Sequence, residues 1–199
     1  MTTTIEPRMS EELCAECGKV LTPGDRVPAG DRVFCASCHA RLQQELVTAV
    51  QAMSEDINYV NAAIGALLGA VVGVVAWWGF TAATKWSIGL IAIGLGWAVG
   101  WGTVRFAGGK RSKELQVLSL AVATAGWIAA TYLVNMTFLN RGFAAQGEAF
   151  RLAFPPASID QAVAVISAGF GIMDVVFLAI MMWEAWKFPR PIQLPPSAA

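Results

Sequence analysis

Histidine is nearly absent from this sequence, which has only His39 among its 199 residues. One imidazole per chain excludes haem ligation by paired histidines, a Ser-His hydrolase and a histidine metal site inside a membrane. A phosphate-binding loop is missing too, because the segment AGGKRS at 107–112 lacks both the GxxxxGK[ST] spacing and a strand before it. We therefore expect a protein that is not an enzyme.

Charge is also scarce, at 14% of the residues, whereas 56% are hydrophobic. Together with 19 glycines and eight tryptophans, this composition lies outside the usual range of soluble domains and is typical of a membrane protein. The charges are divided unevenly, because residues 1–56 carry nine of the 14 acids and only five of the 14 bases. The formal net charge of zero hides an acidic head and a basic membrane part.

The N-terminus lacks the features of a signal peptide. The start MTTTIEPRMSEEL has no basic region followed by an apolar core and a small-residue cleavage site. We expect residues 1–12 to be flexible and the head to be cytosolic.

Four apolar segments follow the head, each near the roughly 20 residues that a helix needs to cross about 30 Å of hydrocarbon. We predict membrane spans at about 60–80, 87–106, 115–138 and 161–184, within a domain of residues 59–186. The expected fold is mainly α, a four-helix transmembrane bundle that carries a small N-terminal treble-clef or zinc-ribbon domain.

Basic residues predict the orientation of this bundle. The loop after the second span and the proline-rich tail at 187–199 carry six of them: Arg105, Lys110, Arg111, Lys113, Lys187 and Arg190. The opposite side has three, Lys85, Arg141 and Arg151. The positive-inside rule then places both termini in the cytosol. We interpret Arg105, Lys110, Arg111 and Lys113 as a solvated loop that contacts anionic lipid headgroups.

Aromatic residues suggest further placements. Trp77, Trp78 and Trp86 would lie at the outer interface, and Trp101, Trp183 and Trp186 near the inner one. Trp97 and Trp127 are expected to fill the core. In the outer loop at 139–160, Phe143, Phe150 and Phe154 would share one face of a short helix that ends before Pro155.

Small residues recur every four positions in the first two spans. Gly65, Gly69 and Gly73 do so in the first, and Ala92, Gly96 and Gly100 in the second. Such grooves allow close helix packing. Packing of the two helices against each other is one interpretation, and a dimerisation face that makes a homo-oligomer is the other.

Two Cys-x-x-Cys pairs form the most specific motif. Cys14, Cys17, Cys35 and Cys38 have the spacing C-x2-C-x17-C-x2-C of a structural zinc site, within a module at 13–40. Turn signals at Pro23-Gly24 and Gly30-Asp31 and β-leaning stretches near Val20 and Val33 predict a zinc knuckle followed by a hairpin. An amphipathic linker helix at 41–58 should lead straight into the first span.

The sequence also allows other uses of this module. His39 adjoins Cys38 and could replace it as a ligand, although four thiolates already complete the shell. A dithiol oxidoreductase would place one reactive pair beside a βαβ pattern, which this segment lacks. A nucleic-acid partner is disfavoured because residues 1–56 carry a net charge of −4.

Asp174 is the costliest residue of the predicted membrane part. An ionised carboxylate in mid-span costs roughly 2.5–3.5 kcal/mol on insertion scales. It would be either a proton or cation site, or a protonated acid bonded to a hydroxyl such as Thr124, Thr131 or Tyr132, or the contact of a partner protein.

The run TKWSIGLIAIGLGWAVG at 84–100, the basic glycine loop after it and LQVLSLAVATAG at 115–126 resemble a group of bacterial multi-pass membrane proteins. Members often carry an N-terminal zinc finger of the ribbon, B-box or LIM kind. The likeness covers about half of the chain and implies a bacterial inner membrane. Because the group has no assigned activity, the likeness transfers no catalytic residue.

These observations favour an inner-membrane scaffold or accessory subunit with a cytosolic, Zn²⁺-binding module that docks a protein partner. The alternative is a small proton- or cation-coupled transporter or channel component that uses Asp174. A membrane-bound redox protein is a third, weaker hypothesis.

Overall fold

The computed structural model describes residues 12–85 and 90–193. It divides into two compact units. Among the described residues, the first comprises residues 12–52 and Gln193, and the second is Met53–Ile192. We refer to residues 12–52 as the head and to residues 53–192 as the helical unit.

The head is a hairpin followed by one helix. Strands β1 (Arg26–Ala29) and β2 (Arg32–Cys35) pair antiparallel with Ala29 opposite Arg32, so the connecting loop is Gly30-Asp31. Gly30 has φ +61°, a value that glycine adopts at little cost in a two-residue hairpin turn. Helix α1 (Ala36–Ala52) begins directly after β2. The predicted hairpin is confirmed, although Val20 pairs with Leu13 in an isolated bridge instead of joining it.

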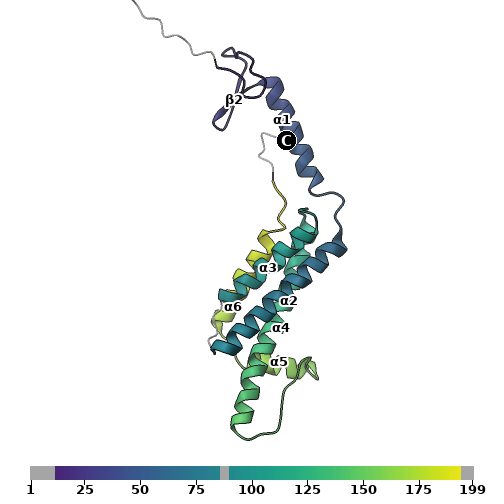
Figure 1. Ribbon diagram of the computed structural model, residues 1–199, viewed down its shortest axis with the longest axis vertical. Helices are drawn as coiled ribbons and strands as arrows, with labels where there is room; N and C mark the ends of the chain where they lie inside the picture. Colours follow the sequence, from purple (N-terminus) through teal and green to yellow (C-terminus); the bar gives the residue numbers. More distant parts are fainter. Residues whose placement is uncertain (1–11, 86–89, 194–199) are drawn as a thin grey trace, which may run out of the picture. The chain divides into compact units, whose positions relative to one another are not determined.

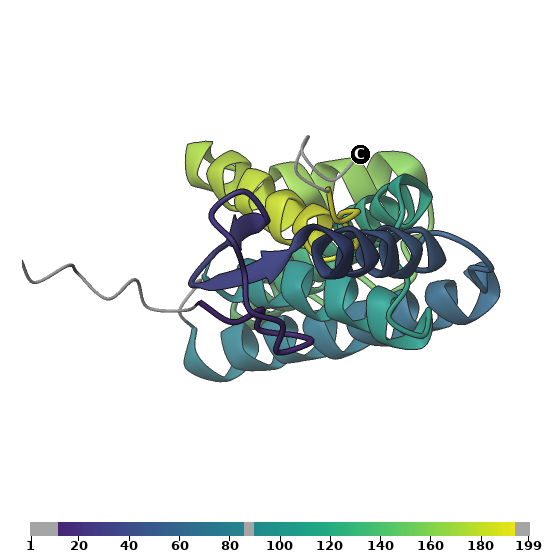
Figure 2. The ribbon, with the colours of Figure 1, turned by 90° about the horizontal axis from the view of Figure 1, so that it is seen from above.

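The described residues of the helical unit form five helices, which run along one another except for α5 (Figure 1). They are α2 (Tyr59–Thr84), α3 (Leu90–Phe106), α4 (Lys113–Ala145), α5 (Ile159–Ser167) and α6 (Ile172–Lys187). Helices α2, α3, α4 and α6 pack against one another as a bundle, which Figure 2 shows from above. Within this bundle α3 contacts α2, α4 and α6.

Two of these helices, α2 and α4, are long and apolar enough to cross a membrane, among the residues that the structure describes. The pair α5 and α6 would add a third span if counted as one. Helix α3 has 17 described residues, and the start of the predicted second span, with Trp86, lies outside the described residues. The described residues therefore contain two or three candidate spans in place of four uninterrupted ones.

The predicted fourth span is wrong as a continuous helix. The chain bends by 107° between α5 and α6. Gly169 and Gly171 are poor helix formers at this break, and the side-chain amide of Asn135 compensates for lost helix bonds by donating to the carbonyls of Val165 (3.0 Å) and Ile166 (3.2 Å).

The first glycine groove lies against α3. A Cβ atom on Gly65 would overlap the backbone carbonyl oxygen of Gly102, and one on Gly69 would overlap that of Ala98. Gly73 packs on Leu95. Absence of side chains therefore allows the backbones of α2 and α3 to touch, as in close helix crossings of membrane proteins.

The second groove faces a different helix. Gly96 lies against the backbone of Met181 and Gly100 against Ala185 and Phe188, all at α6. Helix α3 thus uses one set of small residues for α2 and another for α6. This sorting explains how α3 can sit among three neighbours.

Alanine and a few large side chains fill the core between these helices. Its fully buried members include Ala66, Leu95, Val99 and Met181. Trp127 is 5% exposed and fills the core as predicted. Trp97 is 50% exposed, so the same prediction for it is wrong; the ring stacks on Trp101 at the surface, with ring centroids 6.0 Å apart.

The predicted short helix in the outer loop is absent from the described chain. Helix α4 continues to Ala145, and residues 146–158 are not helical. Asn140 holds the returning chain, because its amide donates to the carbonyl of Leu152 (2.9 Å) and its oxygen accepts from the N–H of the same residue (2.8 Å). The backbone of Leu152 therefore forms its hydrogen bonds with the side chain of Asn140 and not within a helix.

The helix after the cysteines also ends early. Helix α1 stops at Ala52, and the turn that follows contains Asp56 with φ +51°. Asn58 then caps α2 by accepting the N–H of Asn61 (3.0 Å). The prediction that one helix leads straight into the first span is therefore wrong.

Candidate metal centre

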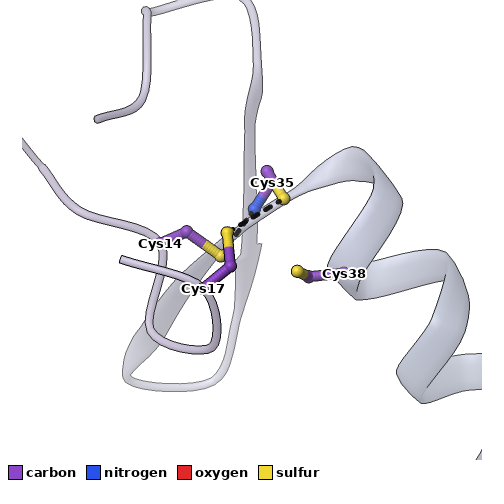
Figure 3. A group of neighbouring side chains, drawn as sticks. All are labelled: Cys14, Cys17, Cys35 and Cys38. Atoms are coloured by element: carbon purple, nitrogen blue, oxygen red, sulfur yellow. Dashed lines mark hydrogen bonds between the residues drawn. The ribbon is translucent and has the colours of Figure 1, made fainter. Parts of the chain in front are cut away.

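The four cysteines come from three local structures of the head (Figure 3). Cys14 and Cys17 lie in a turn closed by the N–H of Gly18, which donates to the carbonyl of Cys14 at 2.9 Å. Cys35 ends β2, and Cys38 lies in the first turn of α1. The hairpin therefore brings together two pairs that are 17 residues apart in the chain.

The sulfur atoms converge on one point. Each cysteine offers its Sγ as one ligand atom, and all four Sγ atoms lie within 4.8 Å of one another. The Sγ atoms of Cys17 and Cys35 are 3.9 Å apart. A tetrahedral shell with metal–sulfur distances of about 2.3 Å has edges of about 3.8 Å, whereas a disulfide would bring two sulfurs to about 2.05 Å. All four cysteines are free thiols, so this arrangement fits a metal ion and not a sulfur–sulfur bond.

Hydrogen bonds lower the pKa of two of the four thiols, which favours the thiolate form that binds a metal ion. The N–H groups of Cys17 and Cys35 lower the pKa of the Cys14 thiol to about 6, and the N–H of Cys35 lies 3.3 Å from its sulfur. The Ser37 hydroxyl, 3.3 Å from the sulfur of Cys35, lowers the pKa of that thiol. The neighbouring sulfur of Cys35 raises the pKa of Cys38 to about 12. Since thiolates repel one another, a cation is needed before all four can ionise together.

The described head has little other core. Its buried residues are Cys14, Leu21, Cys35 and Cys38, with Val33 and Phe34 packed against them. Leu21 is the only aliphatic side chain among the buried four. The thiols therefore occupy the place that apolar side chains fill in larger domains.

The positions of the four sulfur atoms make this cluster a candidate four-cysteine metal centre. No family model, curated protein or solved structure matches the chain. The chemistry of the centre therefore rests on its own atoms.

Two neighbours of the cysteines have different roles. The imidazole of His39 is 3.4 Å from the side-chain amide of Gln43, one helical turn along α1, and lies outside the sulfur cluster. Ser37 was not predicted. A hydroxyl residue between two ligands in the first turn of a helix is the signal that could have identified it, because such side chains reach back to preceding atoms.

Asp174 lies elsewhere than predicted. It is in the first turn of α6, and its carboxylate accepts the N–H of Gly171 at 2.7 Å. Two of the three hydroxyl groups proposed as its partners have other acceptors: Tyr132 donates to the carbonyl of Ala153 (2.7 Å) and Thr124 to that of Leu120 (2.8 Å). Asp174 is therefore a helix-capping residue at the break and not a residue in mid-helix.

The predicted basic loop connects α3 to α4. Arg105 is exposed at the end of α3, and Lys113 is exposed at the start of α4. Arg111 is half-buried, because its guanidinium donates to the carbonyl of Phe188 (2.9 Å) and its backbone N–H to that of Met53 (2.9 Å). Lys110 precedes it in the same loop. Through Arg111, this loop is hydrogen-bonded to the residue that follows α6.

Proposed function

We propose that the protein is a non-enzymatic membrane scaffold or accessory subunit, with a head that binds one Zn²⁺ and docks a partner protein. The convergence of four free thiols within 4.8 Å carries the proposal. The apolar helices supply the membrane anchor. The resemblance of 84–126 to bacterial multi-pass proteins supports an inner-membrane location, and the excess of basic residues in the predicted cytoplasmic segments, six against three, supports a cytosolic position for both termini.

Zinc is the metal that this donor set favours. Four thiolates suit a soft or borderline cation, and tetrahedral sulfur sites are typical of structural zinc. Such sites contribute on the order of 10–16 kcal/mol of apparent binding free energy in model peptides. With so small an apolar core, the head needs a contribution of this size to fold.

We propose partner docking because small zinc-bound modules usually bind another macromolecule. Small zinc modules present rigid loops, and those loops recognise either proteins or nucleic acids. The net charge of −4 on residues 1–56 opposes a phosphate backbone, so we propose a protein partner. A closed shell of four protein ligands leaves no open position for catalysis, which favours a structural role over an enzymatic one.

Elemental analysis of the purified full chain tests the metal. We expect one zinc per chain, and thiol titration after chelation should find four reduced cysteines. Cys35→Ser should lose the zinc, whereas the matched control His39→Ala should keep it. Absence of metal in the parent protein, or a disulfide in its place, would refute the proposal and support the redox hypothesis.

Docking is tested by co-purification from native membranes in mild detergent. We expect a stoichiometric partner with the parent and with His39→Ala, and loss of that partner with Cys35→Ser. Binding of the same purified partner to the two variants would then give the difference in affinity. Equal binding to both would place the docking surface outside the head.

The transporter hypothesis retains one supporting observation, the bend of 107° between α5 and α6. Broken helices of this kind form ion and substrate sites in several transporter folds. Proton or cation flux into liposomes that depends on Asp174, and disappears in Asp174→Asn, would favour transport. Flux equal to that of protein-free liposomes would leave the scaffold proposal in place.

A reporter fused after Ala199 tests the orientation. Activity of a cytosolic reporter, with none from an exported one, is the expected result. The opposite pattern would require an odd number of crossings between a cytosolic head and the C-terminus.

A further inference from the structure

We infer that the helical unit holds one anionic phospholipid, with its phosphate in a basic cleft between the ends of α3 and α6 and an acyl chain in an adjoining apolar groove. The cleft has a volume of about 460 Å³. Its lining residues are Trp101, Val104, Arg105, Gly108, Gly109, Arg111 and Phe188. None of them is acidic.

Two arginines give the cleft its preference for anions. Arg111 is anchored at one end, because one of its nitrogens donates to the carbonyl of Phe188, and a guanidinium has further N–H donors to offer. Arg105 is exposed and has no hydrogen bond or ion pair among the described residues. A phosphate is the group that paired guanidinium forks bind best, through charge-assisted hydrogen bonds.

Glycines keep the cleft open. Gly108 and Gly109 have φ of +72° and +81°. The N–H of Gly109 donates to the carbonyl of Val104 in the last turn of α3 (2.9 Å), as in a helix C-cap. The space beside both glycines is empty, so no side chain fills the approach to the arginines. The loop is therefore thin where a headgroup would enter.

An apolar groove of about 200 Å³ begins beside the cleft. It runs between α2 and α3, and Trp101 lines both cavities. Other lining residues are Leu68, Val72, Trp97 and Phe106, and the close contact at Gly65 and Gly69 forms its floor. Exposed tryptophans at the end of a membrane helix mark the level of the headgroups.

The two cavities lie next to each other because they share Trp101 as a wall, and this proximity favours a lipid over free phosphate. A soluble phosphate would use the basic cleft alone, whereas a phospholipid joins a phosphate to hydrocarbon over a short distance. Without an acyl chain in the groove, its apolar side chains would face the polar headgroup layer. The source of the phosphate is therefore an anionic lipid of the leaflet that contacts the basic loop.

Native mass spectrometry of the full chain in mild detergent tests this inference. Phosphatidylglycerol and phosphatidylcholine with identical acyl chains are the probes. We expect one tightly retained phosphatidylglycerol per chain. Arg105→Gln should weaken its affinity about tenfold, as expected for loss of one charge-assisted contact. The matched control Lys113→Gln removes a charge at the start of α4, outside the residues that line the cleft, and should weaken it less than about threefold.

A second pair of variants tests the groove. Trp101→Leu should weaken retention of phosphatidylglycerol, whereas Trp183→Leu, an exposed tryptophan on α6 that lines neither cavity, should not. Equal loss with Arg105→Gln and Lys113→Gln would overturn the inference in favour of diffuse surface attraction. Equal retention of both lipids, or displacement by millimolar inorganic phosphate, would also overturn it, the latter in favour of a free-phosphate site.

Discussion

The head and the helical unit are stabilised by different means. Leu21 is the only aliphatic side chain that the described part of the head buries, and its remaining buried residues are three cysteines. The helical unit instead buries a continuous set of alanine, leucine, valine and aromatic side chains between four helices. The head has a candidate metal site where the helical unit has close packing. Their stabilities should therefore respond to different changes.

The largest expected effect separates the two units directly. Removal of the metal by a strong chelator, or Cys35→Ser, should remove on the order of 10 kcal/mol of stabilisation from the head. Limited proteolysis should then cut within the head while the helical unit stays intact. His39→Ala should leave both units protected. Simultaneous loss of protection in both would show that they form one folding unit.

The next effect belongs to the helical unit alone. Gly69→Ala would place a methyl group on the backbone carbonyl of Ala98, and overpacking of this kind costs about 1–3 kcal/mol. Unfolding in mixed detergent micelles should show this loss with no change in bound zinc. Gly79→Ala is the matched control, because the space beside Gly79 in the same helix is open. We expect it to be neutral or slightly stabilising, so equal losses would refute the packing argument.

A smaller effect concerns the returning loop. Asn140→Ala removes both hydrogen bonds to Leu152 and should cost about 1–2 kcal/mol. Hydrogen exchange at the Leu152 amide should accelerate, because its acceptor is the removed oxygen. Exchange in the middle of α2 should be unchanged. Unaltered exchange at Leu152 would mean that this clamp contributes nothing to the order of the loop.

The smallest effect is expected at Asp174. Asp174→Ala removes the acceptor for the N–H of Gly171 and should cost about 0.5–1 kcal/mol, the usual range for a cap near a helix N-terminus. Asp174→Asn keeps an acceptor and should cost less. The unfolding midpoint of the helical unit reports this difference. A loss with Asn as large as that with Ala would show that the charge itself is required.

Local patterns predicted the features that depend on neighbours in the chain. Two Cys-x-x-Cys pairs and the Gly30-Asp31 turn were sufficient to predict the four-sulfur cluster and its hairpin. Apolar length indicated α2 and α4, although each helix extends beyond its predicted span. Glycine spacing identified small residues that lie in helix contacts, because contact spacing on a helix is fixed by its period.

Predictions failed where a distant side chain competes with a local preference. The sequence at 161–184 is apolar enough for one span, yet Asn135, about 30 residues earlier, donates to the carbonyls where the helix stops. The phenylalanines of the outer loop have helical spacing, but Asn140 binds the backbone at Leu152 instead. Trp97 was predicted to lie in the core, but the packing of α3 against its neighbours places its ring on the surface.

Two properties followed from the sequence by itself: a head that gathers four thiols, and an apolar chain rich in glycine grooves. Both rest on short-range spacing, which the chain carries into any fold. Tertiary structure decided which helix each groove meets, where the last apolar segment breaks, and that Trp101 and two arginines border a common cleft. These outcomes depend on backbone approach and on hydrogen bonds between residues far apart in the chain, and no local pattern encodes them.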